Sequence, residues 1–273
     1  MALRLVTVVG ANANLLPHML EHYKGMGVDS MSIHIHSETC NDPLISEIKK
    51  IAQSFGASIA SLSVVPWAQG LNPLLYRMSM QEYPDDWFIT ADEDEFQVYP
   101  QDVREIIRLC EEQHYDYVEG FLLDRLAEDG TLRPVVAGRS IWEQFSLGAC
   151  LTGNLLGAVA NKVVLSKGHV RIGGGHHHAR SGVGCPPRSI YVPVHHFKWI
   201  DGLIERLNDR ICTYKRLDDK LWLESEKFVS YYTRHNRIAL EDKDLMIGSC
   251  SPTYEYWDQI VRWRIAAPMF RQA

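Results

Sequence analysis

The chain lacks any pair of cysteines spaced as Cys-x-x-Cys, although it contains six cysteines in 273 residues. That spacing is the usual sign of a zinc ribbon or a thioredoxin-type redox site, so neither kind of site is predicted. Scattered cysteines in a chain of this length are typical of reduced thiols, and we therefore expect a cytoplasmic protein.

Long apolar runs and an N-terminal leader are also missing. No stretch approaches the ~20 uninterrupted apolar residues of a membrane-spanning helix. The first nine residues lead straight into patterned sequence, so no signal peptide is predicted. The tail, with Trp257, Arg262, Trp263 and Arg264, is the segment that would give peripheral contact with a membrane. A packed helix with solvated arginines is the commoner explanation for such a tail.

Basic residues are outnumbered by acidic ones, with 28 Lys and Arg against 34 Asp and Glu and a formal net charge of -6. A nucleic-acid-binding protein usually carries a basic face, so no nucleic-acid partner is expected. Neither of the glycine-rich phosphate loops GxGxxG and GxxxxGK[ST] occurs in the sequence. If a nucleotide binds, its phosphates must therefore be held by a metal ion and by basic side chains.

Apolar runs with β-favouring residues alternate with helix signals along the first hundred residues. Strands are predicted over residues 3–9, 30–36, 57–65 and 87–91. Of the intervening helices, the first is expected to be capped by Asn14, the second by Asn41 or Asp42, and the third to open at Asn72. Farther along, a helix is predicted over 100–113, strands over 117–126, 159–165 and 191–194, and helices from residue 200. This order is typical of parallel strands joined by right-handed crossovers.

The predicted fold is therefore α/β, with a mostly parallel sheet flanked by helices and a C-terminal helical extension. We expect a catalytic domain over residues 1–200 and the extension over residues 201–273. Within the catalytic domain, residues 1–100 are expected to bind the nucleotide and residues 101–200 the acceptor.

The run Asp92-Glu93-Asp94-Glu95-Phe96 follows the predicted strand over residues 87–91. Carboxylates gathered at the end of a buried strand are costly unless a positive charge lies among them. A hard divalent cation such as Mg²⁺ or Mn²⁺ is the economical partner, because it takes oxygen ligands and bridges to phosphates. On spacing alone, an acidic turn that ends the strand in water explains the run equally well.

Ligands of such sheets bind beyond the carboxyl ends of the strands, so residues 10–12, 37–41 and 92–95 should meet there. Gly10, Asn12 and Ser37 are thus candidates for contact with a nucleotide base and ribose. For any one of these stretches, an ordinary strand-to-helix turn is the alternative.

Histidines gather in two places, a glycine-rich loop and the end of a short strand. Residues 176–178 are three histidines in a row, and His196 precedes Phe197-Lys198. His176, His178 and His196 are candidate metal ligands, because a neutral imidazole can complete a site made mainly of oxygens. Simple exposure is the alternative for the loop histidines. Lys162 and Lys198 are candidates to offset a diphosphate leaving group.

In the order of these motifs the chain resembles GT-A-type glycosyltransferases, in particular the family-2-like branch with an Asp-x-Asp-Glu-Phe motif. That motif is Asp92-Glu93-Asp94-Glu95-Phe96 here. The branch is also similar in its earlier and later segments, which correspond to His22-Tyr23, Gly27-Val28-Asp29, 36–42, Lys162, 176–178 and His196-Phe197-Lys198. The resemblance covers most of residues 5–215.

The resemblance implies a metal-dependent hexosyltransferase that moves a sugar from a UDP- or GDP-linked donor to a hydroxyl acceptor. Asp94 would be the main ligand of Mn²⁺ or Mg²⁺, Asp92 would contact the ribose or the metal, and a later histidine would complete the site. The acceptor would be a glycan or a lipid-linked glycan, as in polysaccharide biosynthesis. The first turn, Gly10 to Asn14, lacks the acidic residue that relatives often have there.

An inverting transferase also needs a general base near the acceptor oxygen. Asp124 is the favoured candidate over Glu119 and Asp129, and a salt bridge from Asp124 to Arg125 or Arg133 is the alternative. A retaining enzyme would need no such base.

Two other functions remain open at this point: a nucleotidyltransferase, and a nucleotide-sugar-binding module without turnover.

Overall fold

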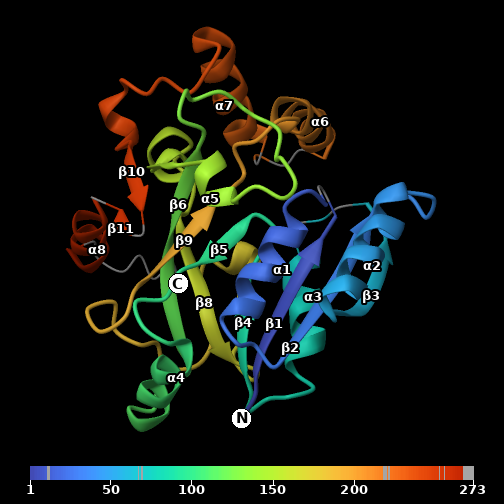
Figure 1. Ribbon diagram of the computed structural model, residues 1–273, viewed down its shortest axis with the longest axis vertical. Helices are drawn as coiled ribbons and strands as arrows, with labels where there is room; N and C mark the ends of the chain where they lie inside the picture. The colour runs from blue at the N-terminus through green and yellow to red at the C-terminus, as the bar shows by residue number, and fades with distance from the viewer. Residues whose placement is uncertain are drawn as a thin grey trace. The chain divides into compact units, whose positions relative to one another are not determined.

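The computed structural model describes residues 1–10, 13–66, 68, 70–217, 220, 222–251, 253–254 and 256–266. The chain forms two compact units (Figure 1). The first unit consists of Met1–Phe121 and Asn161–Val194, and the second of Leu122–Ala160 and His195–Ala273. The predicted catalytic domain over residues 1–200 stays a prediction, because these units divide along a different line.

The first unit is built on a mixed sheet. Its strands are β1 (Leu3–Val9), β2 (Ser30–Ser37), β3 (Ser58–Val64), β4 (Trp87–Thr90), β5 (Glu95–Gln97), β8 (Asn161–Lys167) and the first parts of β6 (Tyr117–Leu126) and β9 (Val192–His196). The main order is β3-β2-β1-β4-β8-β6. The strands from β3 to β4 are parallel, while β8 is antiparallel to both β4 and β6. The predicted α/β fold with a mostly parallel sheet is confirmed.

Helices α1 (Leu16–Gly25), α2 (Pro43–Phe55) and α3 (Leu71–Met80) connect the parallel strands, and α4 (Val103–Glu112) follows β5. Right-handed crossovers place α1 and α2 on one face of the sheet and α3 on the other. Helix α2 has the boundaries that its sequence predicts. The carboxylate of Asp42 caps its first turn by accepting a bond of 2.9 Å from the Leu44 N–H, and Gly56 ends it with φ of 75°.

The face of the sheet under α3 is apolar. The cluster there consists of Val6, Val8, Leu75, Tyr76, Met80 and Phe88, all buried. This packing fixes α3 against β1 and β4, so that its Tyr76 lies near the end of β4.

The carboxyl ends of β1, β2 and β4 lie at one edge of the sheet, because these strands run parallel. Gly10, Ser37 and Asp92 follow or end these strands and lie at this edge, while residues 11 and 12 lie outside the described part of the chain. The meeting of the three stretches stays a prediction. The approach is close at Gly10, where a Cβ atom would lie 2.5 Å from the carbonyl oxygen of His36. Only glycine fits between the two strand ends.

The second unit combines a small antiparallel sheet with helices. Its elements are the second parts of β6 and β9, α5 (Ile141–Gln144), β7 (Leu147–Ala149), the π-helix η1 (Leu151–Leu155), α6 (Leu203–Arg216), α7 (Trp222–His235), the 3-10 helix η3 (Lys243–Leu245), β10 (Gly248–Ser251), β11 (Thr253–Tyr254) and α8 (Trp257–Ala266). Strand β10 pairs with β7 and β11, and β7 with β6. Trp199 and Phe228 pack in its core with ring centroids 4.6 Å apart.

The predicted C-terminal helices are confirmed as α6, α7 and α8. No helix in the described part of the chain has both the length and the apolar character needed to cross a membrane. Contact of the tail with a membrane surface stays a prediction.

Candidate functional site

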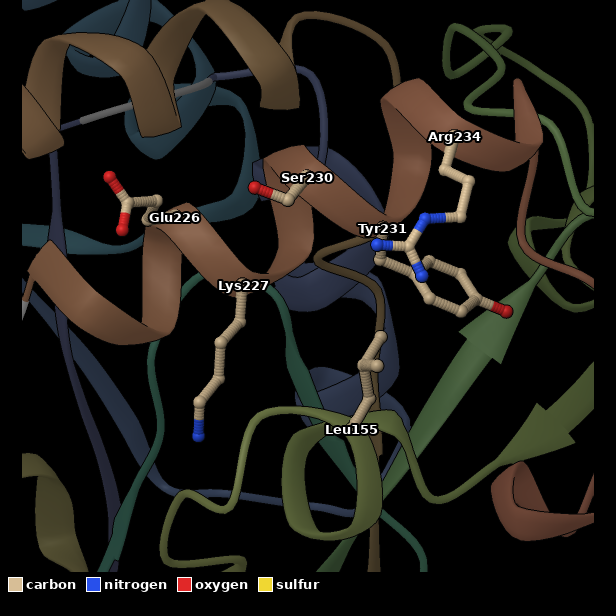
Figure 2. A pocket seen from close by; sticks show the side chains of 6 residues that line it. All are labelled: Leu155, Glu226, Lys227, Ser230, Tyr231 and Arg234. Atoms are coloured by element: carbon tan, nitrogen blue, oxygen red, sulfur yellow. The ribbon is translucent and has the colours of Figure 1, made fainter.

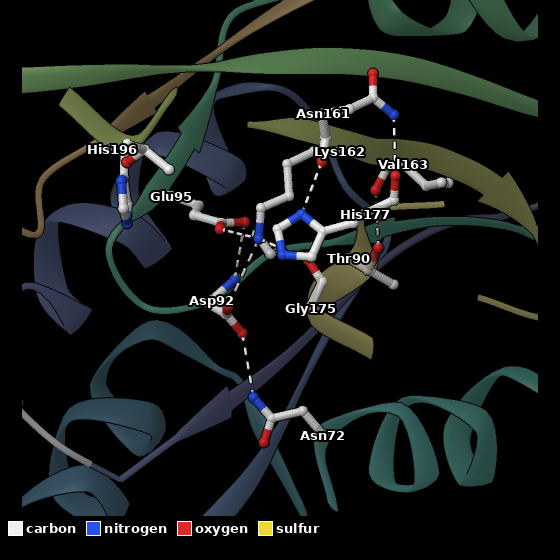
Figure 3. Close-up of polar contacts among 12 residues, drawn as sticks. Asn72, Thr90, Asp92, Glu95, Asn161, Lys162, Val163, Gly175, His177 and His196 are labelled. Atoms are coloured by element: carbon white, nitrogen blue, oxygen red, sulfur yellow. Dashed lines mark hydrogen bonds and ion pairs between the residues drawn. The ribbon is translucent and has the colours of Figure 1, made fainter. Parts of the chain in front are cut away.

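The first unit brings the acidic run and Lys162 together. Strand β8 is antiparallel to β4, so its first residues lie beside the end of β4. The Lys162 ammonium group lies 2.5 Å from Oε1 of Glu95 and 3.9 Å from Oδ2 of Asp92. It also donates a hydrogen bond of 2.8 Å to the carbonyl oxygen of Gly175 (Figure 3). Lys162 is therefore the positive charge that these carboxylates need.

The acidic run forms a tight turn between β4 and β5. The Glu95 N–H donates to the carbonyl oxygen of Asp92 at 3.0 Å, and the Tyr23 hydroxyl donates to the Glu95 carbonyl at 2.9 Å. The turn buries the Glu95 side chain, which is 3% exposed, and leaves that of Asp92 27% exposed. The Glu95 carboxylate is thus held in the interior, while the Asp92 carboxylate is partly exposed at the surface.

Helix α3 holds the Asp92 side chain from the other side. The Tyr76 hydroxyl donates to Oδ1 of Asp92 at 3.0 Å. The Asn72 amide lies 3.4 Å from the same oxygen (Figure 3). These contacts occupy Oδ1, while Oδ2 is the oxygen nearer to Lys162. The orientation of Asp92 is therefore fixed by α3.

His176 ends the 3-10 helix η2 (Gly174–His176) and is 1% exposed. Its φ of 56° is unusual for a residue other than glycine. The ring packs edge-on against Tyr76, with centroids 4.3 Å apart. Neither ring nitrogen has a hydrogen-bond partner among the described residues. Burial lowers the pKa of His176 to about 3, so the ring is neutral.

Asp92, Glu95 and His176 form a group whose potential ligand atoms all lie within 4.8 Å of one another. Two carboxylates and a neutral imidazole suit Mn²⁺ or Mg²⁺. A buried imidazole without a partner costs free energy unless something binds it, which fits a ligand at this point. Asp94, expected to be the main ligand, is not among these three residues, and its metal role stays a prediction.

Lys162 carries its charge in this buried setting. Burial alone would lower its pKa, but the carboxylates of Glu95 and Asp92 outweigh that effect and raise the pKa of Lys162. The side chain is 5% exposed, so its charge is balanced by these neighbours and only weakly by water.

The other two loop histidines differ from His176. His177 Nδ1 lies 2.9 Å from the carbonyl oxygen of Asn161, and burial lowers the pKa of His177 to about 4. His178 is exposed, with its ring against Gly173, where an added Cβ atom would lie 2.5 Å from it. Binding of metal by His178 stays a prediction.

The candidate nucleotide contacts at the strand ends are partly occupied by local bonds. The Ser37 hydroxyl donates to Oδ2 of Asp42 at 2.8 Å and accepts from the Thr39 N–H at 3.2 Å. Ser37 thus stabilises the turn that leads into α2. Asn12 lies outside the described residues. Base and ribose contacts by Gly10, Asn12 and Ser37 stay predictions.

Asp124 lies in the second unit and is 0% exposed. Its carboxylate accepts hydrogen bonds from the Thr152 N–H at 2.6 Å, the Thr152 hydroxyl at 2.7 Å and the Trp199 indole at 2.8 Å. It also lies 2.9 Å from Nδ1 of His196. This geometry supports a role in orienting His196. Action of Asp124 as a general base and of His196 as a metal ligand both stay predictions.

The basic residues expected as alternative partners of Asp124 lie elsewhere. The Arg125 guanidinium donates to the carbonyl oxygens of Phe145 at 2.8 Å and Cys250 at 3.1 Å. Arg133 pairs with Asp129 at 2.6 Å. The alternative for Asp124, a salt bridge to Arg125 or Arg133, is therefore not what these contacts show. Lys198 lies over the Trp199 ring at 5.6 Å from its centroid, and phosphate contact by Lys198 stays a prediction.

A hollow of about 370 Å³ in the second unit is a weaker candidate (Figure 2). It is lined by Leu155, Glu226, Lys227, Ser230, Tyr231 and Arg234. Two of its charged groups are already engaged: Glu226 pairs with Lys215 at 2.9 Å, and Lys227 donates to the Leu156 carbonyl at 2.9 Å. The first unit therefore holds the better candidate site.

No protein-family model and no curated protein sequence matches the chain. Among solved structures, it is similar to a Bacillus anthracis protein assigned as a glucose-1-phosphate thymidylyltransferase, with 14% identity and a TM-score of 0.32. That likeness covers 50% of this chain and 61% of the other. Residues 1–349 of TarS from S. aureus share 9% identity at a TM-score of 0.35, over 97% of this chain and 79% of the other. At these scores the likeness assigns no activity.

Proposed function

We propose that the chain is a metal-dependent transferase that uses a nucleotide-sugar donor and moves the sugar to a hydroxyl acceptor. The observation that carries this proposal is the clustering of Asp92, Glu95 and His176, with an unpartnered buried imidazole, at the carboxyl edge of the sheet. That edge is where α/β sheets bind their ligands.

The ligand set that we propose is Asp92, Glu95 and His176. A divalent cation bound there would neutralise the charge of a departing nucleoside diphosphate. Lys162 supplies a second positive charge at the same place and is proposed to bind the diphosphate oxygens. Asp92 is held in orientation by Tyr76, which reduces the cost of ordering the site when the donor binds.

The donor that we propose is a UDP- or GDP-linked sugar, and the acceptor is a glycan or a lipid-linked glycan. The family resemblance of the acidic motif supports both. The absence of glycine-rich phosphate loops from the sequence also favours a metal and lysine as the phosphate-binding groups. Transfer with inversion is proposed on the resemblance alone.

The proposal is tested by thermal shift with UDP, GDP and CMP, each with and without Mn²⁺. A rise in Tm that needs both nucleotide and metal is expected for the wild type. Asp92→Asn should abolish the metal-dependent part, because it removes a ligand charge. Asp94→Asn is the matched variant within the same turn. It tests whether Asp94, the ligand expected from the motif, holds the metal in place of the group of Asp92, Glu95 and His176.

Turnover is then followed by identifying the product released from a nucleotide sugar. Release of nucleoside diphosphate together with a glycosylated acceptor supports glycosyl transfer. Release or consumption of pyrophosphate would instead support a nucleotidyltransferase. Nucleotide binding that does not depend on Mn²⁺, without turnover, would support a binding module and contradict the proposal.

A further inference from the structure

Lys162 lies against two of the three candidate metal ligands, Asp92 and Glu95. Its ammonium group lies 2.5 Å from Oε1 of Glu95 and 3.9 Å from Oδ2 of Asp92. Its third contact, at 2.8 Å, is the carbonyl oxygen of Gly175, the residue before His176. The lysine therefore touches two of the three candidate metal ligands and the backbone next to the third.

A divalent cation at this position would compete with the ammonium group for the same carboxylates. Glu95, Asp92 and Asp94 all favour the charged form of Lys162, and the His176 ring is neutral. A divalent cation bound with the ammonium group in place would bring two like charges against the same oxygens. Repulsion between them is weakly screened, because Glu95 and Lys162 are buried.

His176 gives an independent indication that the site has a second arrangement, in which another group binds its ring. Both of its ring nitrogens are buried without a hydrogen-bond partner among the described residues. The ammonium contacts of Lys162 go to Glu95, Asp92 and the carbonyl oxygen of Gly175, and none goes to a nitrogen of the His176 ring. The arrangement with Lys162 in place is therefore incomplete at His176.

We propose that Lys162 competes with the divalent metal for Asp92 and Glu95, and that a nucleoside diphosphate draws its ammonium group away. The flexible four-carbon stem of lysine allows this movement without displacement of β8. Metal and nucleotide then bind cooperatively, and each raises the affinity of the other by the same factor. The nucleotide part rests on the proposed function, whereas competition between Lys162 and the metal does not.

The test is calorimetric titration of the full chain with Mn²⁺, alone and in the presence of UDP or GDP. Lys162→Gln retains hydrogen-bonding capacity toward Glu95 and removes the charge, and Lys162→Met removes both. Either change should tighten Mn²⁺ binding about tenfold in the absence of nucleotide, because the competing charge is gone. Lys167→Met is the matched control on the same strand, since its ammonium group pairs with Glu111 at 3.3 Å and Asp116 at 3.7 Å.

UDP or GDP should tighten Mn²⁺ binding to the wild type and to the Lys167 control, and this gain should shrink in the Lys162 variants. Unchanged or weaker Mn²⁺ binding in both Lys162 variants would overturn the inference. If a variant is unfolded without metal, Mn²⁺ should restore its folded circular dichroism signal, and failure to do so also overturns it. Tighter Mn²⁺ binding in the Lys162 variants, together with no effect of UDP or GDP on Mn²⁺ binding to the wild type, would uphold the competition and reject the proposed donor.

Discussion

Lys162 and Glu95 form a buried ion pair, with 2.5 Å between Nζ and Oε1 and side chains that are 5% and 3% exposed. Removal of one partner from such a pair leaves the other charge without compensation in the interior. The pair therefore ties the stability of the first unit to the same residues that form the candidate site.

Glu95→Gln should lower the free energy of unfolding by about 2–4 kcal/mol, because Lys162 then loses its closest counter-charge and keeps Asp92 at 3.9 Å. Urea unfolding followed by circular dichroism measures this loss. The matched control is Glu226→Gln in the exposed pair with Lys215, where a loss below about 1 kcal/mol is expected. Equal losses in the two variants would contradict the buried pair.

His176→Phe should separate metal binding from stability. The phenyl ring keeps the contact with Tyr76 and removes two unpartnered nitrogens, so stability without metal should stay level or rise by about 1 kcal/mol. Mn²⁺ binding should weaken by roughly tenfold or more, because a ligand is lost. His178→Ala, in the exposed part of the same loop, should leave Mn²⁺ binding unchanged. A loss of Mn²⁺ binding in the His178 variant alone would reverse the assignment.

Asp124→Asn should destabilise the second unit by about 2–4 kcal/mol, because its amide group would face donors of Thr152, His196 or Trp199. Asp129→Asn, in a partly exposed pair with Arg133, should cost about 1 kcal/mol or less. If Asp124→Asn instead keeps wild-type stability and loses only turnover, the general-base prediction gains support over the role in orienting His196.

His34 should make the first unit sensitive to acid. The ring is buried between the Ser61 and Ser79 hydroxyls, and burial lowers its pKa to about 4. In the unfolded chain histidine titrates near 6.5. Between these two values the unfolded state binds a proton that the folded state does not, so stability is full above about pH 6.5 and falls as the pH drops toward 4.

His34→Gln should therefore reduce the loss of unfolding free energy between pH 7 and pH 5 by up to about 2 kcal/mol. Urea unfolding at the two pH values gives this difference. Ser79→Ala removes a neighbour of the ring but no titrating group, so it should lower stability and leave the pH dependence unchanged. The same pH dependence in wild type and His34→Gln would rule out this source of acid sensitivity.

The first half of the fold follows from local sequence signals. Apolar runs predict the bounds of β1 to β4 to within a few residues. Asp42 and Gly56 set the ends of α2. The predicted cap at Asn14 is wrong, because α1 begins at Leu16 and Leu15 occupies the cap position. Residues 137–157 could not be assigned, since they form a four-residue helix, a three-residue strand and a π-helix, too short for a clear period.

Only part of the candidate site can be predicted from the sequence, again because short elements show no clear period. Asp92 and His176 were predicted from their positions after a strand and in a glycine-rich loop. Glu95, which we propose as a ligand, is not indicated by the sequence, because the strand that buries it, β5, has three residues and is too short to show a period. The pairing of Lys162 with these carboxylates depends on the antiparallel register of β8 and β4, which no local pattern encodes.

A crystal structure of the full chain with Mn²⁺ and UDP, with anomalous diffraction measured at the manganese edge, would locate the cation and the Lys162 ammonium group directly. We expect an anomalous peak within bonding distance of Asp92, Glu95 and His176, with the Lys162 ammonium group moved onto a diphosphate oxygen. An anomalous peak elsewhere, or Lys162 still paired with Glu95 while Mn²⁺ and UDP are bound, would contradict this expectation.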